Sequence, residues 1–191
     1  YLALVVFMIP ITGNTINSID VLNGVASGFT TIASFALAIS LFILQNYEIG
    51  ITCLALAFAS LAFYKYHKFP SKIFPGDSGA LALGATYGVI AIVGHVEVIA
   101  AIAILPAIVN SFLFLSSVKK VVEHREIKNP TTHTDDFKLK STDDKTTPIT
   151  LVRLIVAKKP LSEKQICNEI FKLTTLSGVL AIITAFMMGV E

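Results

Sequence analysis

Long apolar runs, separated by short polar segments, cover most of the chain. A membrane-spanning helix needs about 20 mostly apolar residues, or somewhat fewer when its ends lie in the membrane interface. Because lipid cannot satisfy backbone amides, and because the runs lack the alternation of barrel strands, each run is predicted to be an α-helix. Six runs qualify, of which the fourth is short: Tyr1–Asn17, Val25–Leu44, Ile49–Tyr66, Gly79–Val93, Val96–Val118 and Leu173–Val190.

The composition supports this interpretation. Hydrophobic residues make up 54% of the chain and charged residues 15%, which is far more apolar than a soluble domain of this size. The predicted fold class is therefore an all-α polytopic membrane protein with about six transmembrane helices and one cytoplasmic loop. The charge pattern calls for no nucleic-acid partner, and Cys53 and Cys167 are expected to have structural roles.

The basic residues are confined to two stretches of the sequence. All 15 Lys and Arg lie in Lys65–Lys72 and Lys119–Lys172. Threading the chain back and forth through a membrane places both stretches on the same side, together with the segment Ser18–Gly24. Cytoplasmic loops carry an excess of Lys and Arg, so this face is predicted to be cytoplasmic.

The same threading divides the chain into three parts. Residues 1–118 form a predicted bundle of five helices, residues 119–172 form a cytoplasmic loop, and residues 173–191 form the last transmembrane helix. Within the loop, Phe137–Lys140 alternates like a strand and predicts a small β-hairpin. Thr150–Ala157 predicts a short amphipathic helix on the membrane surface. Ser162 and Gln165 have the spacing of a capping box, which starts another helix leading into the last span.

Four polar residues recur every three positions where the first apolar run ends. They are Asn14, Asn17, Asp20 and Asn23, and this spacing puts their side chains roughly on one face of a helix. Carboxamides and a carboxylate in such an arrangement can hold a metal, a nucleobase edge or a sugar. Helix capping and hydrogen bonding between helices remain the alternative explanation.

Asp77 gives the sharper signal. It lies between Pro75-Gly76 and Ser78-Gly79, where the Lys-rich segment turns into an apolar helix. An acid at this position can simply cap the helix and interact with its dipole. However, Asp20 lies on the same face, and carboxylates at the membrane edge are candidates for function. Together with carboxamide oxygens, the two acids suit a hard cation such as Mg²⁺.

A third cluster, Glu123-His124-Arg125, follows the fifth apolar run. Arg125 can bind phosphate through its planar guanidinium, with His124 beside it. Such a cationic cluster can equally bind anionic lipid or set the topology. Asn110 is expected to form a hydrogen bond between helices.

Two of these segments resemble the motifs of a known family. Residues 17–24, Asn-Ser-Ile-Asp-Val-Leu-Asn-Gly, are similar to its NxxDGxDG-type segment, and residues 74–84 are very similar to its F-x-G-D-[ST]-G-x-x-x-x-G segment. The family is the polyprenyl-phosphate N-acetylhexosamine-1-phosphate transferase superfamily, glycosyltransferase family 4. It includes the dolichyl-phosphate GlcNAc-1-phosphate transferase and the phospho-MurNAc-pentapeptide transferase.

The resemblance implies an enzyme that transfers GlcNAc-1-phosphate from UDP-GlcNAc to a polyprenyl or dolichyl phosphate, releasing UMP. This reaction is the first step of lipid-linked oligosaccharide assembly for N-glycosylation. In the implied site, Asp77 and Asn17 are catalytic and bind Mg²⁺, with Mn²⁺ as the alternative ion. Asn23 and Asp20 bind the nucleotide, and His124 and Arg125 bind the sugar and its diphosphate. Besides these substrates, the expected partner is membrane lipid, and a homodimer is left open.

Departures from the motifs point to one branch of the family. Asp20 is followed by Val21 and Asn23, where many bacterial members have Gly and Asp, and the loop lacks the His-rich motif of the MurNAc-pentapeptide branch. The dolichyl type of eukaryotes and archaea is therefore favoured. The family's adjacent Asp-Asp pair is expected before Tyr1, so this chain alone is expected to be inactive.

Two other functions remain open from the sequence. Asp20 and Asp77 can be the ion-coupling groups of a membrane transporter, although transporters usually hold such groups near the bilayer midplane. The chain can also be a non-catalytic membrane subunit whose basic loop binds anionic lipid or a partner.

Overall fold

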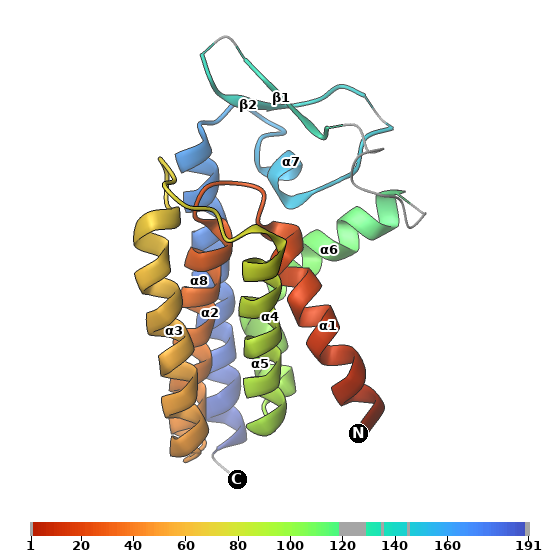
Figure 1. Ribbon diagram of the computed structural model, residues 1–191. Helices are drawn as coiled ribbons and strands as arrows, with labels where there is room; N and C mark the ends of the chain where they lie inside the picture. Colours follow the sequence, from red (N-terminus) through yellow and green to blue (C-terminus); the bar gives the residue numbers. More distant parts are fainter. Residues whose placement is uncertain (1, 119–128, 135, 145, 190–191) are drawn as a thin grey trace.

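The computed structural model describes residues 2–118, 129–134, 136–144 and 146–189. These residues form helices and one small sheet, in agreement with the predicted all-α polytopic membrane fold (Figure 1). Four described helices are long and apolar enough to cross a membrane, or five if the bent pair α5 and α6 counts as one span. The elements are α1 (Leu2–Ile19), α2 (Val25–Ile43), α3 (Tyr47–His67), α4 (Gly76–Val93), α5 (Glu97–Ala103), α6 (Leu105–Val118), β1 (Thr131–His133), β2 (Leu139–Ser141), α7 (Leu151–Ile155) and α8 (Glu163–Met188).

The fifth predicted span, Val96–Val118, is not one helix. The chain breaks at Ile104, and α5 and α6 meet at an angle of 76°. Pro106 explains the break, because it has no N–H for the carbonyl of Ile102 and its ring would clash with that carbonyl in a continuous helix. Helix α6 therefore leaves the bundle and runs toward the polar loop (Figure 1).

Helix α2 lies at the centre of the bundle. Most of its side chains are buried, and it packs between α3 and α8 (Figure 1). Its sequence is apolar on all sides, which is the pattern expected of a buried helix. The residues at its contacts are small, so the neighbouring helices approach closely; a Cβ at Gly28 would lie 2.5 Å from the Phe171 ring.

Helices α1 and α4 are held together by glycines. A Cβ at Gly84 would lie 2.4 Å from the Thr12 carbonyl oxygen, and one at Gly88 would lie 2.2 Å from Thr12 Oγ1. Glycines four residues apart let membrane helices pack with their backbones nearly in contact. This packing places the end of α1, which carries Asn17, beside the start of α4, which carries Asp77.

The polar loop has the local structure that its sequence predicts. Strands β1 and β2 form an antiparallel hairpin in which Thr132 pairs with Lys140. An isolated bridge between Leu139 and Leu161 joins this hairpin to the segment before α8. The predicted capping box is present, and the Ser162 N–H donates to Gln165 Oε1 at 2.9 Å. Helix α7 lies within the predicted amphipathic segment, and α8 continues without a break into the last span.

All three polar parts of the chain that the structure describes lie at one end of the bundle. Figure 1 shows the α1–α2 turn, the α3–α4 connection and the β1–β2 hairpin together at this end, here called the motif end. The α2–α3 and α4–α5 turns and the last turns of α8 lie at the opposite end. The threading of the sequence predicts this arrangement.

Candidate functional site

The α1–α2 turn presents Asp20 and Asn23. Gly24 closes the turn with φ of 87°, a left-handed conformation that favours glycine. A Cβ at Gly24 would lie 2.9 Å from Tyr64 Cε2 and 3.0 Å from Lys68 Cα, so the turn is pressed against the last turn of α3. Asp20 Oδ1 accepts the Ala26 N–H at 3.3 Å. A rigid glycine turn therefore fixes both polar residues.

Asp77 lies in the first turn of α4, after Gly76 with φ of 59°. The N-cap is Pro75, and no side chain caps this helix end. Asp77 is exposed, and its carboxylate makes no hydrogen bond or ion pair with any residue that the structure describes. The capping role that the sequence allowed is thus not realised, and the carboxylate is available to a ligand.

The two acids influence each other electrostatically. Burial raises the pKa of Asp20 to about 6; the charge of Asp77 contributes to this rise, and the Ala26 N–H opposes it. The Asp20 side chain is only 11% exposed. Asp20, just after α1, and Asp77, in the first turn of α4, therefore lie near enough at the motif end for their charges to interact. A cation between them would relieve both the repulsion and the cost of burial.

The residues present fit a hard cation held by few protein ligands. Asn17, on the last turn of α1, is half-buried, and its side-chain amide makes no hydrogen bond with any described residue. Among the described residues, no group of three or more His, Cys, Asp or Glu surrounds a metal position. Mg²⁺ commonly takes one or two carboxylates and completes its shell with water and substrate phosphates, so Asp77 and the Asn17 amide oxygen suit it.

Two other asparagines have packing roles. Asn14 Nδ2 donates to the Pro10 carbonyl of its own helix at 2.8 Å. Asn110 is the interhelical hydrogen bonder that the sequence predicts. Its Nδ2 donates to the Ser18 carbonyl at 3.1 Å, and its Oδ1 accepts the Leu151 N–H at 2.9 Å. Asn110 therefore ties α6 to the end of α1 and to α7.

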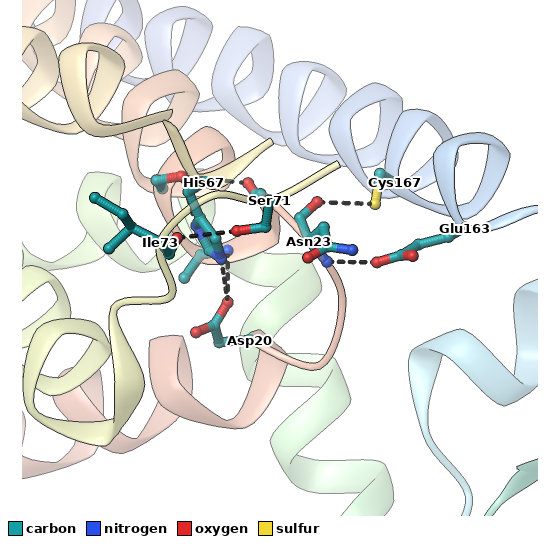
Figure 2. A network of polar contacts seen from close by, with 10 residues as sticks. Asp20, Asn23, His67, Ser71, Ile73, Glu163 and Cys167 are labelled. Atoms are coloured by element: carbon teal, nitrogen blue, oxygen red, sulfur yellow. Dashed lines mark hydrogen bonds and ion pairs between the residues drawn. The ribbon is translucent and has the colours of Figure 1, made fainter. Parts of the chain in front are cut away.

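A buried histidine that the sequence interpretation missed joins both motifs. Figure 2 shows His67, the last residue of α3, beside Asp20, and its Nε2 is 3.7 Å from Asp20 Oδ1. His67 Nδ1 is 2.9 Å from Ser27 Oγ, and its ring lies 6.0 Å from that of Phe74. The only signal in the sequence is a histidine at the end of an apolar run, which is a weak one.

Asn23 is held from the far end of the sequence. Its N–H donates to Glu163 Oε1 at 2.6 Å, and its carbonyl accepts a weak hydrogen bond from Cys167 Sγ at 3.5 Å (Figure 2). The side-chain oxygen of Asn23 is buried and has no hydrogen-bond partner among the described residues. An unpaired buried acceptor is costly, which makes it a candidate contact for a ligand.

A cavity of about 610 Å³ adjoins this turn. It lies between the end of α1, helix α6 and the polar loop, and its lining includes Leu22, Phe114, His133, Phe137 and Glu163. The lining combines apolar side chains with polar ones, including Asn110, His133 and Glu163, which can orient a ligand. His124 and Arg125, the predicted sugar and phosphate ligands, lie outside the described residues, so their place relative to this cavity stays a prediction.

Comparison with known proteins identifies the family. The family model described as Glycosyl transferase family 4 matches residues 1–95. The chain belongs to this family. It is 42% identical over 93 residues to a phospho-N-acetylmuramoyl-pentapeptide-transferase of Clostridium botulinum, covering 49% of this chain and 29% of that protein. It is 30% identical over 180 residues to a putative glycosyltransferase, MJ1113, of Methanocaldococcus jannaschii, covering 94% of this chain and 58% of that protein.

The matched region contains both sequence motifs. Residues 1–95 include the α1–α2 turn, His67 and Asp77, whereas the polar loop and α8 lie beyond it. The similarity to the Methanocaldococcus protein extends over nearly the whole chain. The matched regions thus span 29% of the length of the Clostridium protein and 58% of the length of the Methanocaldococcus protein.

Proposed function

We propose that this chain belongs to a membrane enzyme that transfers GlcNAc-1-phosphate from UDP-GlcNAc to a polyprenyl phosphate of the dolichyl type, releasing UMP. The observation that carries the proposal is that Asn17, on the last turn of α1, and Asp77, in the first turn of α4, both lie at the motif end, and that neither side chain has a hydrogen-bond partner among the described residues. Both motifs of the family meet there.

Each group then has a role that its surroundings support. Asp77 and Asn17 would hold Mg²⁺, which when bound would neutralise charge on the diphosphate. The Asn23 amide contacts the nucleoside, because its buried oxygen needs a donor. Asp20 orders the same turn through the Ala26 N–H. His124 and Arg125 hold the sugar and its diphosphate.

The reaction is a phosphoryl transfer. An oxygen of the lipid phosphate forms a bond to the β-phosphorus of the nucleotide sugar, and the bond from that phosphorus to the bridging oxygen breaks, so UMP leaves. Such a reaction needs positioning and charge neutralisation more than covalent help from the protein. The motif end supplies both at the edge of the membrane, where a soluble nucleotide sugar can meet a lipid phosphate. By the distribution of Lys and Arg, this edge faces the cytoplasm.

The support for GlcNAc and dolichyl phosphate comes from the α1–α2 turn, where Val21 and Asn23 differ from the Gly and Asp of many bacterial members. Asp20 directly follows α1 and Asp77 lies in the first turn of α4, so both lie at helix ends that Figure 1 shows at one end of the bundle. This position, away from the middle of the helices, favours an enzyme over an ion-coupled transporter.

The test measures UMP release from UDP-GlcNAc by the full-length protein in the presence of Mg²⁺ and dolichyl phosphate. Asp77→Asn should lower turnover about a hundredfold or more, because it removes a charge from the diphosphate site. Asp143→Asn removes an exposed acid from the polar loop and serves as the control. Wild-type turnover by a correctly inserted Asp77→Asn protein would refute the proposal, as would substrate uptake into sealed vesicles without UMP formation.

A further inference from the structure

The turn that carries Asn23 is anchored by the first two turns of α8. Glu163 and Cys167 lie four residues apart, on one face of that helix, and both contact the backbone of Asn23. Glu163 Oε1 accepts its N–H at 2.6 Å, although 140 residues separate the two in sequence. Both backbone polar groups of Asn23 are thus bound from α8 (Figure 2).

This contact has the features of a strong restraint. A hydrogen bond from a backbone N–H to a carboxylate is charge-assisted and contributes more than a neutral one. Glu163 lies in the first turn of α8, where the helix dipole stabilises a negative charge. The capping box formed by Ser162 and Gln165 fixes that turn. The acceptor is therefore held in place before any ligand arrives.

The restraint also connects the turn to the polar loop. Leu161, two residues before Glu163, exchanges two backbone hydrogen bonds with Leu139 of the hairpin, at 2.9 and 3.1 Å. Glu163 and Leu139 both line the cavity, and Leu22, the residue before Asn23, lines it as well. One short segment thus contacts the hairpin, the cavity and the turn.

We propose that Glu163 is a positioning residue for the nucleotide sugar, which acts by fixing the backbone of Asn23 so that its unpaired side-chain oxygen faces the ligand. This proposal rests on the proposed function, because it takes Asn23 to contact the nucleoside. The side-chain oxygen of Asn23 lacks a hydrogen-bond donor among the described residues, and the imide N–H of a uracil base can supply one. Without Glu163, the Asn23 N–H loses its hydrogen-bond partner and the α1–α2 turn becomes more mobile. Nucleotide binding must then order the turn, and this entropy cost lowers the affinity.

The experiment measures the Kd of UMP by titration calorimetry, and kcat and KM for both substrates, with the full-length protein. Glu163→Ala should weaken UMP binding and raise KM for UDP-GlcNAc about tenfold, with KM for the lipid phosphate unchanged. Glu163→Gln keeps a neutral acceptor and should stay within about threefold of the wild type. Glu169→Ala, on the same helix, loses only an exposed pair with Lys172 and should not differ from the wild type.

A second pair of variants separates positioning from general destabilisation. In an Asn23→Ala background, Glu163→Ala should weaken UMP binding by less than about twofold further, because its effect passes through Asn23. Glu163→Asp keeps the charge and the helix dipole but shortens the reach. Glu163→Asp should weaken UMP binding several-fold. It replaces Glu163→Ala in the test if the alanine variant does not fold.

Three results would overturn the proposal. They are wild-type UMP affinity in folded Glu163→Ala or Glu163→Asp, an equal loss in Glu163→Gln and Glu163→Ala, and full additivity with Asn23→Ala. A wild-type protein that neither binds nor releases UMP would instead overturn the proposed function, and this inference with it.

Discussion

The helices are connected in different ways at the two ends of the bundle. At the opposite end, the α2–α3 and α4–α5 turns have the same hydrogen bonds. The Asn46 N–H donates to the Leu41 carbonyl and the Val96 N–H to the Ala91 carbonyl, both at 2.9 Å. Each turn places one residue, Gln45 or His95, in the left-handed conformation, with φ of 60° and 54°. This pattern is a Schellman motif, in which backbone groups satisfy the helix end, and the Asn46 side chain adds one long hydrogen bond from Nδ2 to the Gly94 carbonyl at 3.5 Å.

The motif end uses side chains instead. Its α1–α2 turn depends on the carboxylates of Asp20 and Glu163, and its neighbour His67 is buried with an Nε2 that has no hydrogen-bond partner among the described residues. The side-chain oxygen of Asn23 is also buried without a hydrogen-bond partner among the described residues. The difference teaches that the opposite end is built for connection, whereas the motif end keeps buried polar groups without hydrogen bonds among the described residues: the Asn23 side-chain oxygen, and His67 Nε2, whose one polar neighbour there is Asp20 Oδ1 at 3.7 Å. Such groups cost stability, and function is the reason to keep them.

Among the variants that test this difference, Gly84→Ala should have the largest effect on stability and turnover. The new methyl group would meet the Thr12 carbonyl oxygen, which belongs to the backbone and cannot rotate away, so α1 and α4 must separate. We expect a loss of about 3 kcal/mol in the free energy of unfolding and a fall in turnover of about a hundredfold. Thermal unfolding and UMP release measure the two effects. Gly189→Ala, whose methyl group would find ordinary contacts at the opposite end, is the control; equal effects would show that the α1–α4 contact has no special role.

Asp20→Asn should separate stability from function at the motif end. The folded-state pKa of Asp20 is raised from 3.8 to about 6, so its contribution to stability is present below pH 3.8 and is lost as the pH rises through 6. Asparagine keeps the acceptor for the Ala26 N–H without the buried charge. We expect the variant to be more stable than the wild type by roughly 2 kcal/mol at pH 7.5, to match it near pH 4, and to bind UMP more weakly.

The measurement for Asp20→Asn is the difference in unfolding temperature between the two proteins from pH 4 to pH 8. A constant difference over that range would contradict a raised pKa. A saturating concentration of Mg²⁺ should stabilise the wild type more than the variant, because the cation relieves the repulsion between Asp20 and Asp77.

Gly24→Ala should damage the α1–α2 turn directly. Alanine is strained at φ of 87°, and its methyl group would also approach Lys68 Cα at 3.0 Å. We expect a loss of about 2 kcal/mol in the free energy of unfolding, together with weaker UMP binding, because Asn23 precedes this residue. Stability and affinity that both match the wild type would show that the turn tolerates another conformation.

The smallest effect, and of opposite sign, should come from Gln45→Gly at the opposite end. Glycine removes the strain of a left-handed glutamine, while the backbone hydrogen bonds of the turn stay in place. We expect a gain of about 0.5 kcal/mol in the free energy of unfolding and unchanged turnover. Lower turnover in this variant would mean that the opposite end also contributes to function.

Much of the fold follows from local sequence. The lengths of the apolar runs predict the helices, and the Lys and Arg distribution predicts which segments share an end. The β-hairpin, the capping box and the interhelical role of Asn110 are also predicted correctly. These features depend on residues close in sequence or on simple counting of crossings, so no detailed packing is needed to infer them. The sequence interpretation missed the break at Ile104, although Pro106 follows two residues later, because a proline inside an apolar run can also be tolerated within a transmembrane helix.

The sequence by itself determined the membrane class and the pair of motifs that name the family, since apolar length and turn chemistry are written in neighbouring residues. Only the tertiary structure decided that Glu163 holds Asn23, that His67 lies between the motifs, and that Asp77 leaves its own helix uncapped. These contacts join residues far apart in the chain, and they depend on how closely the glycines of α2 and α4 let helices approach. No local pattern encodes that distance, because packing fixes it across the whole bundle.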